Sequence, residues 1–115
     1  MSPDQSPNPV LWTGGIAVVR LPVEVDVTNA QGVLDDLAGA LGNGATVLIV
    51  DMSDTTFCDS AGVAALVHAR QKAVANRARL RIVTQSQAVR RVLSLTDVDT
   101  LIPVFATLDE AKAAE

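Results

Sequence analysis

The feature that most constrains the fold of this chain is a short, almost wholly apolar run at its centre, residues 45–50. From Val47 to Val50 no polar residue alternates with the apolar ones, so a strand formed here needs cover on both faces. Strands of this kind are typical of parallel sheets that are packed between helices. The run therefore predicts a central strand of an α/β domain.

Strand and helix patterns alternate along the chain on both sides of this run. We predict strands at residues 16–21, 45–50, 80–83 and 101–105, and helices from about 29 to 41, 60 to 77, 88 to 93 and 108 to 114. The second helix carries Val63, Leu66, Val67, Arg70 and Val74 on one stripe, and Thr107 is expected to cap the last helix. The order predicts an α/β fold with a mostly parallel sheet of four to five strands and about four helices.

Length and composition bound the classes of protein that remain. The 115 residues fit one domain, expected at 11–115, after a disordered N-terminal tail at 1–10 that contains three prolines. The net charge of −4 argues against a nucleic-acid partner, and no apolar run approaches the 18 residues of a membrane span. One cysteine excludes an internal disulfide, and we expect a cytoplasmic protein.

The basic residues are unevenly distributed. Seven of the nine fall within 22 positions: Arg70, Lys72, Arg77, Arg79, Arg81, Arg90 and Arg91. They either form a basic face or lie on ordinary solvated helix and strand edges, and the second interpretation is the simpler one.

One serine stands where the central strand gives way to the second helix, in the run Phe57-Cys58-Asp59-Ser60-Ala61-Gly62. The first turn of a helix has free backbone N–H groups and the positive end of the dipole, and both favour an added negative charge. Asp59 is a good N-cap candidate for this helix. Since no base is found near Ser60, we interpret it as a serine that another protein modifies.

The other residues that an enzymatic mechanism at this segment would need are not found in suitable positions. His68 is the only histidine and lies eight positions further along the same helix, about 12 Å away at ~1.5 Å per residue, whereas a general base needs to come within about 3 Å. Asp51 ends a strand as the phosphate-accepting aspartate of response-regulator receivers does, but no acidic pair follows the first strand and the last strand carries no lysine before Pro103. We expect no cofactor and no metal, and interpret Cys58 as a small buried hydrophobic residue.

The stretch from Val47 to Val63 resembles the strand, acidic loop and D-S-[ST]-G signature of STAS domains of the bacterial anti-sigma factor antagonist type. Ala61 stands where the family usually has Ser or Thr. Residues 21–26 resemble the family's G-E-x-D segment, with Pro22 in place of glycine, and residues 80–98 resemble its next strand and helix, with Asp97 near a family glycine. The resemblance covers about residues 14–113 and implies a STAS-like fold.

The resemblance also implies a function without catalysis. In that family the unphosphorylated protein binds a serine kinase that is also the anti-sigma factor and so releases the sigma factor; phosphorylation abolishes binding, and a serine phosphatase restores it. Carried over, the phosphorylation site is Ser60, and the partner-binding residues are Asp26, Asp59, Ser60, Ala61 and Gly62. Two alternatives stay open: a non-switching scaffold or ligand-sensing module of a larger assembly, and an enzyme that uses Ser60 or Cys58.

Overall fold

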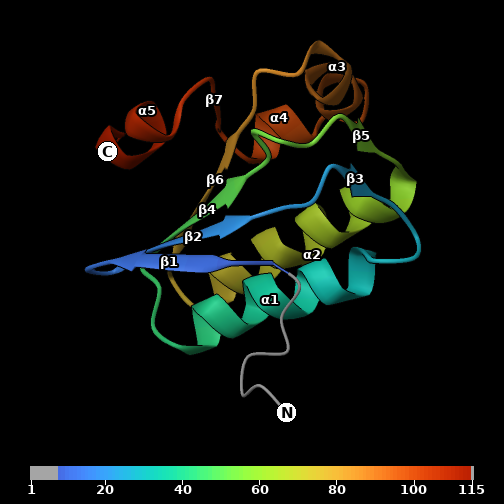
Figure 1. The fold of residues 1–115 in the computed structure, drawn as a ribbon. Helices are drawn as coiled ribbons and strands as arrows, with labels where there is room; N and C mark the ends of the chain where they lie inside the picture. The colour runs from blue at the N-terminus through green and yellow to red at the C-terminus, as the bar shows by residue number, and fades with distance from the viewer. Residues whose placement is uncertain (1–7, 115) are drawn as a thin grey trace.

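The structure of the protein, a computed structural model, describes residues 8–114 and consists of one main sheet, one small ladder and five helices (Figure 1). The strands are β1 (Val10–Thr13), β2 (Ile16–Arg20), β3 (Glu24–Val25), β4 (Val47–Asp51), β5 (Phe57–Cys58), β6 (Arg79–Val83) and β7 (Val104–Phe105). The helices are α1 (Ala30–Gly42), α2 (Ser60–Ala75), α3 (Gln87–Leu95), α4 (Val98–Leu101) and α5 (Leu108–Ala113).

The main sheet has the strand order β1-β2-β4-β6-β7. β2, β4, β6 and β7 pair in parallel, and only β1 is antiparallel to its neighbour β2. The predicted α/β fold with a mostly parallel sheet of four to five strands is therefore confirmed. β1 was not predicted, because its four residues lie between Pro9 and Gly14 and show no alternation of apolar and polar side chains.

The first described residues fall within the expected tail at residues 1–10. β1 begins at Val10, and Asn8 is buried with its side-chain amide donating to Asp36 Oδ2 (2.6 Å). Residues 8–10 of the expected tail are thus packed against the domain. The rest of that tail, residues 1–7, lies outside the described residues.

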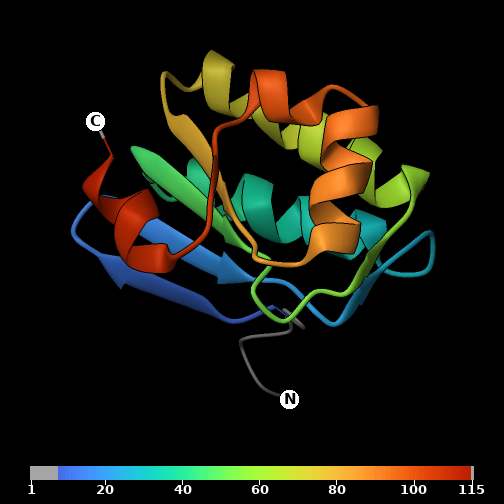
Figure 2. The same ribbon diagram turned by 90° about the horizontal axis from the view of Figure 1, so that it is seen from above.

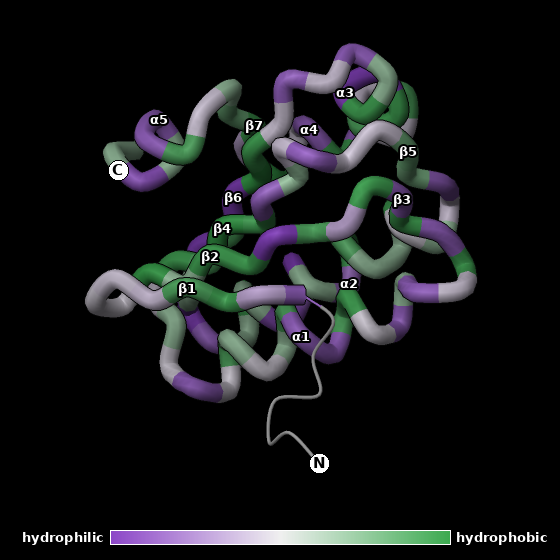
Figure 3. Tube along the Cα trace, in the orientation of Figure 1, coloured by the Kyte–Doolittle hydropathy of each residue, from purple (hydrophilic) through white to green (hydrophobic). Residues whose placement is uncertain are grey.

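Helices cover the two faces of the sheet unequally (Figure 2). The larger core joins Leu48, Val50 and Ile82 of the sheet to buried residues of α1, α2, α3 and α4. On the other face, Ile49 and Val83 pack in a small cluster with Ala111 of α5. Figure 3 shows the corresponding concentration of hydrophobic residues along the central strands. β4 is covered on both faces, as its unbroken apolar sequence predicts.

Helix α2 buries a different stripe from the one the sequence marks. Its buried residues are Gly62, Ala65, Leu66, Ala69 and Ala73. In contrast, Val74 of the predicted stripe is 60% exposed, and Val63 and Val67 are only half-buried. Helix α1 packs directly against α2, and small side chains at this contact let the two helices approach closely. The buried face of α2 therefore consists mostly of alanine, with Leu66 as the large side chain among its buried residues.

The predicted strand at residues 101–105 is wrong over its first half. Leu101 ends the short helix α4, and β7 contains only Val104 and Phe105. Asp97, between α3 and α4, has a φ of 61°, and α4 begins at the next residue. That left-handed conformation favours glycine, which fits the place of Asp97 near a glycine in the family resemblance. The other predicted helices agree closely, including the Thr107 cap of α5, which forms a full capping box with Glu110.

Candidate functional site

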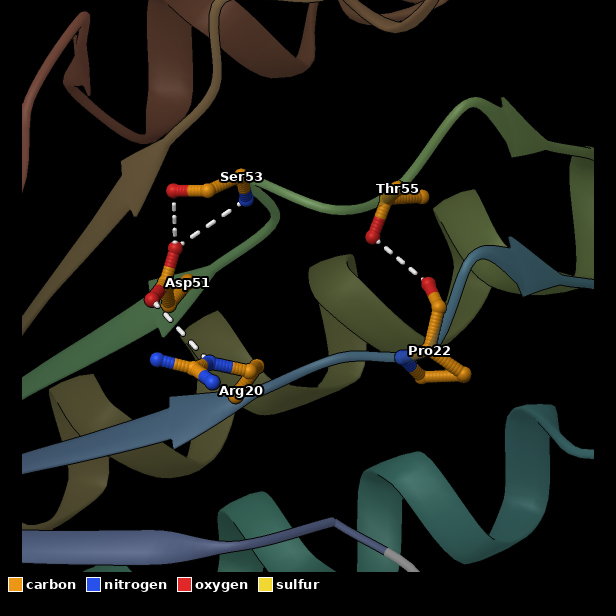
Figure 4. Close-up of polar contacts among 5 residues, drawn as sticks. All are labelled: Arg20, Pro22, Asp51, Ser53 and Thr55. Atoms are coloured by element: carbon orange, nitrogen blue, oxygen red, sulfur yellow. Dashed lines mark hydrogen bonds and ion pairs between the residues drawn. The ribbon is translucent and has the colours of Figure 1, made fainter.

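The segment that leads from β4 to Ser60 is fixed by polar contacts (Figure 4). The carboxylate of Asp51, at the end of β4, is buried and accepts hydrogen bonds from the backbone N–H (3.0 Å) and the hydroxyl of Ser53. Its other oxygen lies 3.8 Å from Arg20 Nε. Further on, the buried Thr55 donates its hydroxyl hydrogen to the carbonyl oxygen of Pro22 (2.8 Å). These contacts tie the loop to the end of β2.

A two-residue ladder then places the segment after β2 beside the segment that precedes Ser60. β3 pairs in parallel with β5, so that Val25 stands opposite Cys58. The N–H of Asp59 extends the pairing by donating to the carbonyl oxygen of Val25 (3.1 Å). Figure 1 shows the result: β3, β5 and the first turns of α1 and α2 lie on the same side of the molecule.

Asp59 caps helix α2 and presents Ser60 at its first position. Asp59 has an extended backbone, and its Oδ1 accepts hydrogen bonds from the N–H groups of Ala61 (2.9 Å) and Gly62 (3.1 Å). The predicted N-cap is therefore confirmed. Ser60 is exposed, Asp59 and Ala61 are partly exposed, and Gly62 is buried. The Ser60 hydroxyl thus stands open to solvent at the positive end of a 16-residue helix.

Asp26 lies at the same end of the ladder as Ser60. It follows Val25 directly, so both aspartate and serine leave the ladder where β3 and β5 end. Its Oδ1 accepts hydrogen bonds from the side chain and the backbone N–H (2.9 Å) of Thr28. These hydrogen bonds, the side-chain one first, lower the pKa of Asp26 below its ordinary value of 3.8. The site therefore carries two carboxylates, Asp26 and Asp59, both engaged in local turns.

Three exposed apolar side chains, for which the sequence predicted no role, lie on or next to the β3–β5 ladder. Val23, Val27 and Phe57 are 56%, 77% and 49% exposed, although residues of these types are usually buried. Val23 also accepts the N–H of Thr56 (2.8 Å), so it lies beside the loop that leads to Ser60. We refer to these three side chains, all within two residues of the β3–β5 ladder, as the apolar rim. In the sequence these three residues are separate hydrophobic positions near polar ones, which is only a weak indication that they are exposed together.

A shallow groove begins next to this rim, between α1 and α2. Its volume is about 180 Å³, and its walls include Ala30, Leu34, Ala61, Ala64 and His68. His68 is exposed there, eight positions after Ser60 along α2. The groove gives the serine a neighbouring concave surface with small side chains.

Cys58 directly precedes Asp59, and its surroundings keep its thiol protonated at neutral pH. Burial, and secondarily the charge of Asp59, raises the pKa of the Cys58 thiol to about 11, so the reactive thiolate is scarce at neutral pH. Cys58 is buried, which confirms its interpretation as a packing residue. Within residues 8–114, no group of three or more His, Cys, Asp or Glu side chains is placed to hold a metal ion. None of the helices in that range is both long and apolar enough to cross a membrane.

Comparison with known proteins matches these features to one family. The STAS domain model matches residues 10–111. The anti-sigma-F factor antagonist RsfB of Mycobacterium tuberculosis is 24% identical over 110 residues, which cover 96% of this chain and 89% of RsfB. A crystal structure of an anti-sigma factor antagonist from Mycobacterium paratuberculosis is similar with a TM-score of 0.84 and 26% identity, over 96% of this chain and 94% of that one.

The phosphorylated form of SpoIIAA, a cell-fate determinant of Bacillus, shares the fold with a TM-score of 0.70 and 23% identity, over 91% of this chain and 96% of SpoIIAA. The family match extends from β1 to α5 and so includes every element that positions Ser60. RsfB and the Mycobacterium paratuberculosis protein are anti-sigma factor antagonists, and this chain belongs with them to the STAS domain family.

Proposed function

We propose that the protein is an anti-sigma factor antagonist whose binding is controlled by phosphorylation of Ser60. The observation that carries the proposal is the exposed hydroxyl of Ser60 at the capped start of α2, beside the apolar rim of Val23, Val27 and Phe57. The names of its relatives support the same role: RsfB is an anti-sigma-F factor antagonist, and SpoIIAA exists in a phosphorylated form. The role is one of binding and not of catalysis.

In the proposed mechanism, the unphosphorylated protein binds an anti-sigma factor that is also a serine kinase, and the sigma factor is released. The binding surface, here called the Ser60 surface, consists of Ser60, the two aspartates, the apolar rim and the groove between α1 and α2. The apolar rim and the groove at Ala61 and Ala64 supply the contact area, and Asp26 and Asp59 lie within it. Such a kinase uses ATP, so the proposed switch operates in the cytoplasm. A serine phosphatase restores the binding form.

The effect of phosphate follows from the different surroundings of Ser60 in the free and bound states. Phosphorylation adds a charge of about −1.5 to −2 at neutral pH. In the free protein this charge is solvated and stands at a helix N-terminus, which stabilises it by roughly 0.3–1 kcal/mol. In the complex it would lie beside Asp59 under an apolar partner surface, where desolvation costs several kcal/mol. A loss of about 4 kcal/mol weakens binding about a thousandfold.

The direct test is to incubate the protein with ATP and each anti-sigma factor kinase of the source organism, and to locate the phosphate by mass spectrometry. We expect phosphate on Ser60 and none on the Ser60→Ala variant. Phosphate on another residue of wild type and Ser60→Ala alike would refute the proposal. Absence of modification by any kinase, together with large oligomers in solution, would favour the non-switching scaffold.

Binding to the same kinase tests the electrostatic part separately. Ser60→Ala should bind as wild type does, whereas Ser60→Asp should bind at least about a hundredfold more weakly. Ser94→Asp is a matched control, because it adds the same charge at an exposed serine of α3 outside the Ser60 surface. Equal binding by Ser60→Asp and Ser94→Asp would contradict the mechanism.

A further inference from the structure

A second concave surface lies at the other end of α2. It is a cavity of about 250 Å³ between α2, β6 and the segment that links α4 to β7. Its walls include Arg70, Val74, Arg79, Arg81, Leu101 and Pro103. Val74 follows Ser60 by fourteen residues, which corresponds to about 21 Å along the helix axis at ~1.5 Å per residue. The cavity therefore lies near the end of α2 that is opposite Ser60.

The cavity arises because β7 is too short to cover β6. β7 pairs only with Ile82 and Val83, so the first three residues of β6 have no strand beside them on that side. Pro103 precedes β7 and has no backbone N–H to extend the pairing. Before Pro103 the chain forms α4, which packs near α2, so the space beside the first residues of β6 stays open. An irregular end of the sheet, and not a mobile loop, forms this cavity.

Its walls carry positive charge without carboxylates. None of the residues that line the cavity is Asp or Glu. Within residues 8–114 the structure contains one ion pair, Arg20 with Asp51, so neither Arg70 nor Arg79 is paired there. Arg81 is buried and donates through Nη1 to the carbonyl oxygen of Ala111 (2.7 Å), so α5 holds its guanidinium group on the face of the sheet opposite α2, and the positive charge of the cavity comes from Arg70 and Arg79. Burial and the charge of Arg79 lower the pKa of Arg81, as expected where no acidic group compensates it.

The chemistry of the walls points to one class of ligand. The planar guanidinium group matches carboxylate and phosphate oxygens in two-pronged hydrogen bonds. Val74 and Leu101 are 60% and 44% exposed at the same cavity, so an apolar surface accompanies the charge. The volume lies just below the range of about 300–1,000 Å³ that is usual for drug-sized ligands. A ligand that fits is small, anionic at one end and apolar at the other.

We propose that this cavity binds a small organic anion, with its carboxylate or phosphate-ester group held by Arg70 and Arg79 and its apolar part against Val74 and Leu101. The same chemistry is offered by a free metabolite and by an acidic side chain of a partner protein, and the experiment distinguishes these two sources. Arg90 and Arg91, which follow in the basic stretch of the sequence, lie on α3 and do not line the cavity. Of the seven basic residues in that stretch, Arg70, Arg79 and Arg81 therefore line the cavity.

The test is a titration of the ¹⁵N-labelled protein followed by NMR. Phenyl phosphate represents the free anion, inorganic phosphate lacks the apolar part, and the peptide acetyl-Leu-Glu-Leu-amide represents a partner's acidic side chain. We expect saturable shifts confined to signals of the cavity, such as Ala73, Leu80 and Leu101, and weaker binding of inorganic phosphate than of phenyl phosphate. Tighter binding of phenyl phosphate assigns the free anion, and tighter binding of the peptide assigns the partner.

Variants make the result specific. Arg70→Gln and Arg79→Gln should each weaken binding about tenfold or more, because each removes a charge-assisted hydrogen-bond donor. Arg91→Gln removes an exposed arginine of α3 and should leave the affinity unchanged. The proposal is overturned if neither phenyl phosphate nor the peptide binds saturably, or if Arg91→Gln weakens binding as much as Arg79→Gln. Ser60→Ala should not affect this binding, so its outcome is independent of the phosphorylation switch.

Discussion

The Sγ of Cys58 lies only 2.6 Å from the position that a Cβ on Gly62 would occupy. The same Cβ would be 3.0 Å from Val25 Cγ1 and 3.3 Å from the carbonyl oxygen of Val25. The first turn of α2 is therefore packed directly onto the β3–β5 ladder, with no room for a side chain at residue 62. This contact sets how closely the first turn of α2, which begins with Ser60, approaches the ladder. It also explains why the signature needs a glycine two positions after the serine.

Replacing Gly62 by Ala should lower the free energy of unfolding by about 1–3 kcal/mol, because the added methyl group overpacks this contact. Urea denaturation measures the change. Gly39→Ala in α1 is the matched control, since a Cβ there meets nothing within 4 Å, and it should stabilise the protein by about 0.5–1 kcal/mol. In the double variant with Cys58→Ala, the loss should be smaller than the sum of the two single losses. Strict additivity would show that the contact with Cys58 is not the cause.

Asp59→Ala should cost about 1 kcal/mol of stability, because the N–H groups of Ala61 and Gly62 lose their acceptor. Asp59→Asn keeps an acceptor oxygen and should cost much less. Thermal unfolding followed by circular dichroism compares the three proteins. If Asp59→Asn is as unstable as Asp59→Ala, then charge and not capping explains the role of Asp59.

Ser60→Asp should leave the fold intact and change the free energy of unfolding by no more than about 1 kcal/mol. Ser60 is exposed at the helix N-terminus, so the added carboxylate stays solvated and interacts favourably with the dipole. Denaturation by urea and the dispersion of the NMR spectrum check this. A larger loss, or collapsed NMR dispersion, would mean that the proposed switch acts by unfolding instead of at the interface.

The hydrogen bonds of Asp26 predict a pH dependence of stability. Because the folded protein holds the pKa of Asp26 below its ordinary value of 3.8, the aspartate contributes stability above that value. The contribution is lost as the pH falls through the lowered pKa. The difference in melting temperature between wild type and Asp26→Asn should therefore be largest near neutral pH and disappear in acid. A difference that grows in acid would have the wrong sign.

Cys58 should react slowly with iodoacetamide in the folded protein, both because it is buried and because its pKa is about 11. In 8 M urea, which exposes the thiol, alkylation at the same pH should be complete within minutes. Mass spectrometry of timed samples follows the reaction. Rapid alkylation of the native protein at neutral pH would indicate a reactive thiol and reopen a redox role for Cys58.

Much of the fold is readable from local patterns. The unbroken apolar run of β4 predicts cover on both faces, and the packing of Ile49 toward α5 and Leu48 toward α1 and α2 confirms it. The caps at Asp59, Ser86 and Thr107 are also predictable, because a cap depends on residues within four positions along the chain.

Features that depend on distant segments were missed or misplaced. The exposed strand β1 forms by pairing with the edge of β2, and the buried face of α2 is set by where this helix packs against the rest of the domain. The predicted strand at residues 101–105 failed at Leu101, because a left-handed Asp97 allowed a helical turn that apolar periodicity does not reveal.

For the site, the sequence by itself determined which hydroxyl begins α2 and which carboxylate caps that helix, because both follow from short-range backbone chemistry at Asp59 and Ser60. Only the tertiary structure decided what surrounds them. The ladder of Val25 with Cys58 joins segments 33 residues apart, and it alone gathers Asp26, Val27 and Phe57 at the serine. Such pairing is governed by the free energy of packing the whole domain, which no local pattern encodes.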